Sequence, residues 1–307
     1  MTNGASNRFL NLYTMKYGAI DIGTNAARLL IGEVLHDADR SFVKKISYTR
    51  IPLRLGDDVF SMGKVAAKKK LNLINTMKAF QIITNIFEVS QVQAFATSAM
   101  REAANAGQIV LDIKGATGID LKIISGTEEA NVILNSIMLF DLDPVFPMVI
   151  IDVGGGSTEI NIFKDRENVV SKSFKVGALR ILRGKFSEAV WSEINEWIAS
   201  YIVPGEEYAL FGIGGNIKKA YKLLVHGANK AAAYEELIKL KKQLESLTLP
   251  ERMEKFQLRP DRADVIVPAL DIYTRVISNF KCNFIHVPKV SLSDGMVYQM
   301  YLKEKNK

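Results

Sequence analysis

The chain has 307 residues, of which 48% are hydrophobic and 24% are charged. One hydrophobic core rarely grows to this size, so we expect two domains of roughly 130 to 170 residues. The composition excludes a small disulfide-stapled scaffold and a disordered chain. The single cysteine, Cys282, leaves no internal disulfide and indicates a reducing compartment.

The net charge of +7 favours a polyanionic partner, although a generic basic surface explains it equally well. No apolar run approaches the roughly 20 residues that cross a bilayer, and the first residues lack the apolar stretch of a secretory signal. We therefore expect a cytoplasmic protein without a membrane partner. No nucleic-acid-binding motif is present, so no specific nucleic acid is expected. Residues 1–15 are expected to form a flexible tail.

The first predicted element is a hairpin over residues 17–34, in which an apolar, β-prone run meets an Asp-x-Gly turn and then resumes. The turn contains Asp21. The elements that we expect next are a strand, a long amphipathic helix, a strand, a helix and a strand, at residues 42–51, 62–87, 92–98, 99–106 and 121–126.

The same hairpin pattern returns at residues 148–163, with Asp152 placed 131 residues after Asp21. This spacing indicates a duplicated chain. The elements expected after the second hairpin are strands at 169–177 and 208–215 and helices at 187–202, 216–225 and 262–280, with a charged helical insertion at 231–257. A last helix, capped near Ser293, is expected over residues 293–307.

Strands followed by alternating helices and strands predict a mixed sheet flanked by helices, twice over. We place the domains at residues 1–126 and 127–307, with the last helix returning to the first domain. Ligands of open α/β sheets collect at the carboxyl ends of the strands, so both Asp-x-Gly turns are expected to face one interdomain cleft.

Three consecutive glycines follow Asp152, and glycine weakens a strand interior. A bare backbone offers N–H groups that can approach an anion closely, whereas a lone glycine run is more often only a tight turn. The matching turn after Asp21 favours a phosphate cradle, and a third glycine turn precedes a helix. The predicted phosphate-binding residues are Asp21, Gly23, Thr24, Asn25, Gly154, Gly155, Gly156, Ser157, Gly214 and Gly215.

Asp21 and Asp152 each end an apolar strand, where a charge is costly unless it is paired or bound to a cation. Carboxylates beside a phosphate site are suitable ligands for Mg²⁺, which prefers oxygen, or for another divalent cation. Glu159, on the return strand, adds another carboxylate. The alternative for Glu159 is an exposed residue paired with a lysine.

Ser125 and Glu128 have the spacing of a capping box, which explains Glu128 structurally. Glu129 has no such explanation. At the start of a helix beside the cleft, its carboxylate is placed to polarise a water for attack on a phosphate. The alternative is a simple interaction with the helix dipole.

Arg101 follows a strand and is suited to clamp a phosphate, unless it forms a surface ion pair with Glu102 or another neighbouring residue. Weaker candidates of the same kind are Arg50, Arg54 and Lys175. No zinc site is predicted, because the three histidines share no ligand spacing: His36, His226 and His286.

In this order, the motifs DIGTNAARLL, LRLGDDVF, ATSAMREAAN, IISGTEEA, IDVGGGSTEI, KVGALRI, GIGGNIKKA, RADVIVPAL and LSDGMVYQM resemble the exopolyphosphatase and guanosine-pentaphosphate phosphohydrolase (Ppx/GppA) family. The resemblance extends from about Lys16 to Tyr301. It implies an α/β fold of two ribonuclease H-like domains, as in the actin, Hsp70 and sugar-kinase superfamily.

The resemblance also implies roles for individual residues. Glu129 matches the catalytic base, Arg101 the arginine at the terminal phosphate, and Asp152 and Glu159 the acidic positions that are associated with magnesium. The implied reaction releases orthophosphate from polyphosphate or guanosine pentaphosphate, and a homodimer is common among relatives.

The chain departs from the family pattern where Thr24 and Ala26 replace serines and Asn216 replaces a threonine. A glycine common in the helix that starts near residue 262 is also absent, and the chain has no residues for the C-terminal helical domain of longer relatives. Two other functions use the same loops: a kinase of the same superfamily, and a non-catalytic sensor of an alarmone or polyphosphate.

Overall fold

The structure, a computed structural model, describes residues 15–37, 40–137, 147–164, 167–224 and 231–306. Its first sheet has the strand order β3-β2-β1-β4-β5. The β1, β2 and β3 strands pair antiparallel, and β4 and β5 continue parallel to β1. The strands are β1 (Tyr17–Ile22), β2 (Ala26–Asp37), β3 (Arg40–Pro52), β4 (Gln91–Ala96) and β5 (Leu121–Ile123).

The second sheet repeats this arrangement, with the order β10-β11-β9-β6-β7-β8. Its β6–β7–β8 meander and parallel β9 correspond to β1–β2–β3 and β4. The expected pair of ribonuclease H-like α/β domains is confirmed. The strands are β6 (Met148–Val153), β7 (Thr158–Lys164), β8 (Glu167–Phe174), β9 (Ala209–Ile213), β10 (Ala231–Ala233) and β11 (Phe284–His286).

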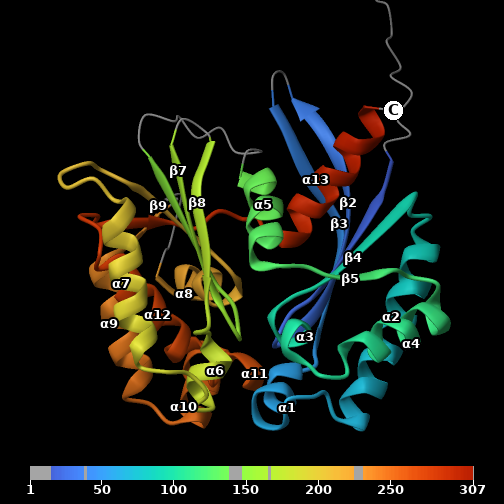
Figure 1. Ribbon diagram of the computed structural model, residues 1–307, viewed down its shortest axis with the longest axis horizontal. Helices are drawn as coiled ribbons and strands as arrows, with labels where there is room; N and C mark the ends of the chain where they lie inside the picture. The colour runs from blue at the N-terminus through green and yellow to red at the C-terminus, as the bar shows by residue number, and fades with distance from the viewer. Residues whose placement is uncertain (1–14, 38–39, 138–146, 165–166, 225–230, 307) are drawn as a thin grey trace, which may run out of the picture.

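The helices of the first half are α1 (Leu55–Met62), α2 (Ala67–Ile86), α3 (Ser98–Glu102) and α4 (Ala106–Thr117), of which α2 and α4 cover the outer face of the first sheet (Figure 1). Those of the second half are α6 (Ala178–Leu182), α7 (Ala189–Tyr201), α8 (Gly215–Leu224), α9 (Tyr234–Glu245), α10 (Leu249–Phe256), α11 (Pro260–Ala263) and α12 (Ile266–Ile277).

Two helices, α5 (Gly126–Ile137) and α13 (Leu292–Lys305), lie between the sheets (Figure 1). They form one buried core with residues of both sheets, among them Tyr17 of β1 and Met148 of β6. A Cβ at Gly295 of α13 would overlap the Val132 carbonyl oxygen of α5, so a glycine lets the two helices pack closely. The two halves therefore share a hydrophobic core behind the site.

Three predicted helices differ from the structure. The helix expected at 62–87 begins only at Ala67, because Gly63 ends a separate helix, α1, which was not predicted, in a left-handed conformation (φ +71°). The helix expected at 262–280 is interrupted between α11 and α12, where Asp264 reaches across to Arg54 at 2.7 Å. The last helix is capped at Ser291 instead of Ser293.

The α4 helix was not predicted. It contains two glycines, which lower helix propensity, but it buries Ile109 and Ile113 completely against the first sheet. Tertiary packing outweighs local propensity here. The insertion at 231–257 is helical as expected, except for the short β10 strand at its start. In the described ranges, no helix combines the length and the apolar character that crossing a bilayer requires.

Candidate active site

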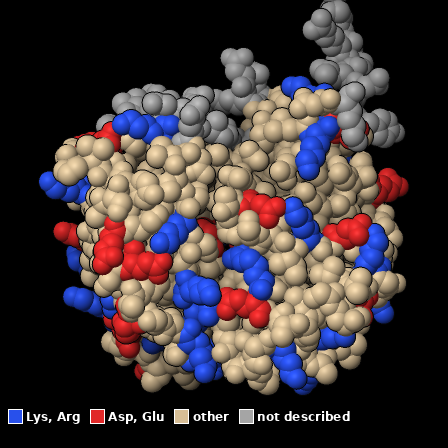
Figure 2. Space-filling model, in the orientation of Figure 1, with Lys and Arg blue, Asp and Glu red and all other residues tan. Residues whose placement is uncertain are grey.

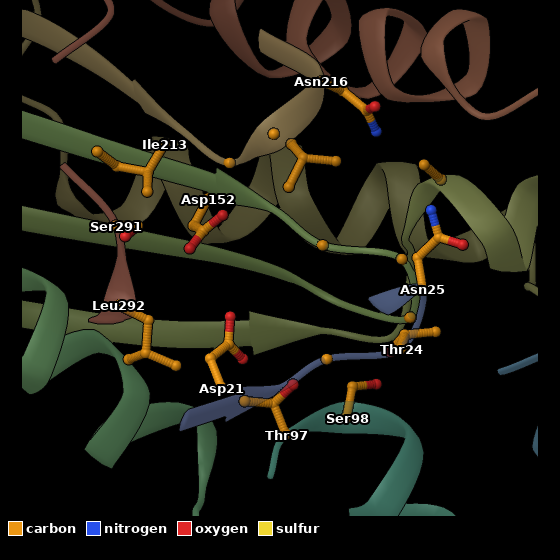
Figure 3. Close-up of a pocket in the computed structure, with 18 of the residues that line it drawn as sticks. Asp21, Thr24, Asn25, Thr97, Ser98, Asp152, Ile213, Asn216, Ser291 and Leu292 are labelled. Carbon is orange, nitrogen blue, oxygen red and sulfur yellow. The ribbon is translucent and has the colours of Figure 1, made fainter. Parts of the chain in front are cut away.

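A cavity of about 170 Å³ lies between the two halves, at the carboxyl ends of β1 and β6. Every predicted phosphate-binding residue lines it, as do Glu129, Asp152 and Glu159. Figure 3 shows Asp21 and Asp152, from different sheets, pointing toward one another across this space. The expectation that both Asp-x-Gly turns face one cleft is therefore met by the geometry.

The glycine loop is fixed from behind by the start of α6. The Gly155 carbonyl accepts hydrogen bonds from the backbone N–H groups of Leu179 at 2.8 Å and Arg180 at 3.0 Å, and the Gly156 carbonyl accepts one from Arg180 Nε at 2.7 Å. The N–H groups of Gly155 and Gly156 donate to no acceptor among the described residues. The loop thus presents free donors to the cavity, as an anion cradle requires.

The glycines are also needed for close packing. A Cβ at Gly155 would lie 3.0 Å from Thr24 of the first turn, and one at Gly156 would lie 2.6 Å from the Phe60 ring. A Cβ at Gly177 would lie 2.6 Å from the Gly155 carbonyl carbon. Larger side chains would push the two loops apart. The glycines therefore leave the backbone N–H groups accessible and keep the cleft narrow.

The two hairpins differ in the residue that faces the aspartate carboxylate across the strands. Asp21 is the cross-strand partner of Arg28, whose Nη1 donates to Asp21 Oδ2 at 2.6 Å. Asp152 is the cross-strand partner of Glu159, another acid. The Asp152 carboxylate has no hydrogen-bond partner in the described part of the chain, and burial followed by the charge of Glu159 raises its pKa to about 7.

Glu129 projects from the first turn of α5 and is held by Arg101, whose Nη1 donates to Glu129 Oε2 at 3.0 Å. Burial, followed by the negative charge of Glu159, raises the pKa of Glu129 well above its ordinary value, although Arg101 opposes this effect. The preceding Glu128 forms the predicted capping box, since it accepts the Ser125 N–H at 2.9 Å while Ser125 Oγ accepts the Glu128 N–H at 3.1 Å.

The structure excludes two of the simpler alternatives. Arg101 does not pair with Glu102, which instead binds Arg180 at 2.5 Å. Glu159 is not an exposed partner of a lysine: it is 2% exposed and accepts a hydrogen bond from Ser173 Oγ at 2.7 Å. Arg101 itself lies beside the cavity, 3.7 Å from Glu159 and 3.5 Å from Ser157.

The carboxylates that line the cavity are suited to hold a divalent cation whose other ligands include oxygens of a bound phosphate. Within the described ranges, no three His, Cys, Asp or Glu side chains are close enough to hold a metal by themselves. Mg²⁺ commonly uses only one or two carboxylates and completes its shell with waters and phosphate oxygens. Asp152 is an unpartnered carboxylate whose pKa is raised by burial and then by the charge of Glu159, and a bound cation would relieve the repulsion between the two acids.

The weaker candidates for phosphate binding differ in whether they line the cavity. Arg50 lines the cavity and binds Asp261 at 2.5 Å across the interdomain boundary. Arg54 bridges Asp57 and Asp264, and Lys175 is exposed; neither lines the cavity. Of the three histidines, His226 lies outside the described residues, whereas His36 and His286 do not line this cavity.

Several lining residues were missed by sequence reasoning. Arg28 was recoverable, because pairing the strands of the first hairpin places it opposite Asp21. Others carry no local signal, since segments far apart in the sequence bring them to the cavity, among them Thr97, Ser98, Lys218, Arg262, Ser291 and Leu292. Lys218 donates to the Val290 carbonyl, and burial lowers its pKa to about 8.

The fold and the cavity define a two-domain α/β protein with a glycine-lined, acidic and basic cleft between its halves. Comparison with known families is consistent with this class. The model of the Ppx/GppA phosphatase family matches residues 34–304, and the chain belongs to that family.

Curated relatives include exopolyphosphatase 1 of Mycobacterium leprae, which is 28% identical over 55% of this chain and 49% of its own length. The bifunctional 3-dehydroquinate synthase/phosphatase of Fusobacterium nucleatum is 26% identical over 88% of this chain and 44% of its own length. The chain thus spans about half the length of the curated relatives it matches.

Solved structures share the fold. The exopolyphosphatase of Cytophaga hutchinsonii has a TM-score of 0.79 at 24% identity, covering 94% of this chain and 98% of its own. The Aquifex aeolicus member of the Ppx/GppA family has a TM-score of 0.76 at 22% identity, covering 95% and 99%.

Proposed function

We propose that this protein is a phosphoanhydride hydrolase that releases orthophosphate from the end of inorganic polyphosphate. The observation that carries the proposal is the position of Glu129: a carboxylate of raised pKa, oriented by Arg101, lines the same cavity as a loop with free N–H donors. Membership of a phosphatase family and the names of the mycobacterial relatives support it. Guanosine pentaphosphate, whose terminal bond is of the same kind, is the second proposed substrate.

In the proposed reaction, the Gly155 and Gly156 N–H groups and Arg101 bind oxygens of the terminal phosphoryl group. Glu129 accepts a proton from a water as the water oxygen attacks the terminal phosphorus. The bond between that phosphorus and its bridging oxygen breaks, and the electron pair leaves with the remaining chain. The products are orthophosphate and a chain that is one unit shorter. Positioning and charge stabilisation supply most of the catalysis.

Mg²⁺, the proposed cofactor, would be held by Asp152 and Glu159. When bound, it neutralises phosphate charge and polarises the scissile bond. Burial raises the pKa of both carboxylates, and at Asp152 the charge of Glu159 raises it further, so a cation would keep them ionised. The expected cytoplasmic location and homodimer stay predictions.

The test is the substitution Glu129→Gln, with Glu128→Gln as the matched control on the same helical turn. Loss of a general base lowers turnover by about 10²- to 10⁴-fold. We therefore expect Glu129→Gln to lose orthophosphate release from polyphosphate at that scale while its circular dichroism and melting temperature stay near those of the parent protein. The control removes only the exposed ion pair with Lys122, since glutamine can also complete a capping box, and it should retain turnover.

Normal turnover in Glu129→Gln would remove this residue from the mechanism. Assays with polyphosphate, guanosine pentaphosphate and ATP, with and without Mg²⁺, separate the proposal from the two other functions. Phosphate transfer that requires an added acceptor would identify a kinase, and Mg²⁺-dependent binding without turnover of any substrate would identify a sensor.

A further inference from the structure

Arg180, in α6, is buried where the two halves meet, and groups of three kinds hold its guanidinium. Its Nε donates to the Gly156 carbonyl at 2.7 Å, and its Nη2 donates to Glu102 at 2.5 Å. The guanidinium carbon lies 4.0 Å from the centre of the Phe60 ring, which adds a cation–π contact. Phe60 and Glu102 belong to α1 and α3 of the first half, so Arg180 connects the two halves.

The ion pair between Arg180 and Glu102 differs from those on the surface. Figure 2 shows acidic and basic side chains interspersed over a face on which both halves are visible. Exposed ion pairs stabilise a protein little. The Arg180 side chain is only 9% exposed, and a buried cation that loses its acidic partner is costly. The position of Arg180 therefore depends on Glu102, which comes from the other half.

Two hydrogen bonds from Arg180 set the direction of two peptide planes in the glycine loop. Its backbone N–H donates to the Gly155 carbonyl at 3.0 Å, and its Nε donates to the Gly156 carbonyl. In a trans peptide, the carbonyl and the following N–H point in opposite directions. The N–H groups of Gly156 and Ser157 are therefore turned away from Arg180, and neither donates to an acceptor among the described residues. Both residues line the cavity.

Glu102 connects Arg180 to the other part of the site. It directly follows Arg101 in α3, and Arg101 donates to the Glu129 carboxylate at 3.0 Å. A continuous series of contacts thus joins the loop that receives a phosphoryl group to the carboxylate proposed to activate water. In-line attack requires these two parts to be aligned, and a misplacement of about 1 Å can lower the rate by about 10²-fold.

We propose that Arg180 is a positioning residue. It directs the N–H groups of Gly156 and Ser157 toward the terminal phosphoryl group. Through Glu102, it also fixes the helix that carries Arg101. The inference rests on the proposed function. Because Arg180 does not itself line the cavity, its loss should alter the alignment of a bound substrate more than its affinity, and so lower kcat more than it changes KM.

The first test is Arg180→Lys, which keeps the charge but offers one ammonium nitrogen in place of the planar fork. We expect the kcat for orthophosphate release from tripolyphosphate to fall about 10²-fold and the KM to change less than about threefold. Glu102→Gln, at a position with a partly exposed side chain, should lower kcat about tenfold. Since Glu102 acts through Arg180, the double variant should be no slower than Arg180→Lys alone.

The matched control is Arg183→Gln. Arg183 also pairs with an acid of the first half, Asp57 at 2.7 Å, but its side chain is 47% exposed, and no hydrogen bond joins it to the glycine loop in the described ranges. Its kcat should stay within about twofold of the parent value. If Arg180 only held the halves together, Arg183→Gln would cause a similar loss. That result, a parent-like kcat in Arg180→Lys, or additive effects in the double variant would overturn the proposal.

A spectrum of the loop separates this inference from the proposed function. Only three glycines follow another glycine in the sequence: Gly155, Gly156 and Gly215. In protein that contains glycine labelled with nitrogen-15 and carbonyl carbon-13, an HNCO spectrum therefore shows these three amides alone. Tripolyphosphate added to the Glu129→Gln protein should shift the resonances of Gly155 and Gly156, because their N–H groups are free donors.

Adding Arg180→Lys to the Glu129→Gln protein should reduce the shifts of Gly155 and Gly156 by about half or more, because their N–H groups lose their alignment. Any shift of Gly215, at the start of α8, should stay as it is. An undiminished response of the loop glycines, or no response before Arg180 is changed, would contradict the inference. If the parent protein hydrolyses no substrate, the proposed function fails while this comparison still decides the inference.

Discussion

The two hairpins of the duplicated fold place the same residue, aspartate, at the same strand end, but they give it opposite partners. In the first, Asp21 pairs across the strands with Arg28; in the second, the equivalent register pairs Asp152 with Glu159. The first hairpin is therefore internally neutralised. The second places two acids side by side, and their charges add to the effect of burial in raising the pKa of Glu129.

This difference shows how the two copies of a duplicated fold can use the same residue for different purposes. A compensated carboxylate stabilises its own turn, whereas an uncompensated pair at a buried site is costly unless a cation or a proton joins it. The comparison predicts that equivalent substitutions at Asp21 and Asp152 have different consequences.

The largest effect is expected for Asp152→Asn, which removes the unpartnered carboxylate proposed to hold Mg²⁺. Loss of such a group should lower the kcat for orthophosphate release by about 10²- to 10³-fold. Phosphate release at saturating Mg²⁺ measures it, with the exposed Asp120→Asn as a control. Full activity in Asp152→Asn would show that the asymmetry between the hairpins has no catalytic meaning.

Asp21→Asn should act mainly on stability, because it leaves Arg28 without its partner in a partly desolvated turn. Breaking such a pair costs about 3 kcal/mol of unfolding free energy. Urea denaturation measures this loss, and Asp21→Asn/Arg28→Met should regain most of it. If the single and double variants were equally unstable, ion-pair compensation would not explain the first hairpin.

The smallest effect concerns pH. The folded-state pKa of Asp152 is raised to about 7, so the metal-free folded protein holds a proton that the unfolded chain has already released. Its contribution to stability is complete below the unfolded pKa and is lost as pH rises through about 7. In a chelator, the melting temperature should fall by a few degrees between about pH 5 and about pH 8.

The Asp152→Asn variant should flatten this slope, and Glu128→Gln should not, because hydrogen bonds with Lys122 and Ser125 lower the pKa of Glu128 to about 2, outside the window. An unchanged slope in Asp152→Asn would assign the pH response to other groups.

Local sequence determined much of the molecule. Strand periodicity, two Asp-x-Gly turns and their spacing predicted the duplicated fold, because hairpin turns and alternating apolar residues are short-range signals. The capping box explains Glu128 but not Glu129, and this difference indicates a functional role for Glu129. The structure places Glu129 in the cleft. The break after Gly63 was also local, because a glycine can end a helix in the left-handed conformation, but its signal was overlooked.

Only the tertiary structure decided which charges meet. Arg50 and Asp261 are 211 residues apart in the chain but form an ion pair, and Arg54 reaches Asp264 in the same way. Such contacts depend on how the two halves pack around α5 and α13. No local pattern in the sequence specifies which distant residues meet. Lys218 and Arg262 line the cleft for the same reason, because they come from α8 and α11, which are distant in the sequence from the first hairpin.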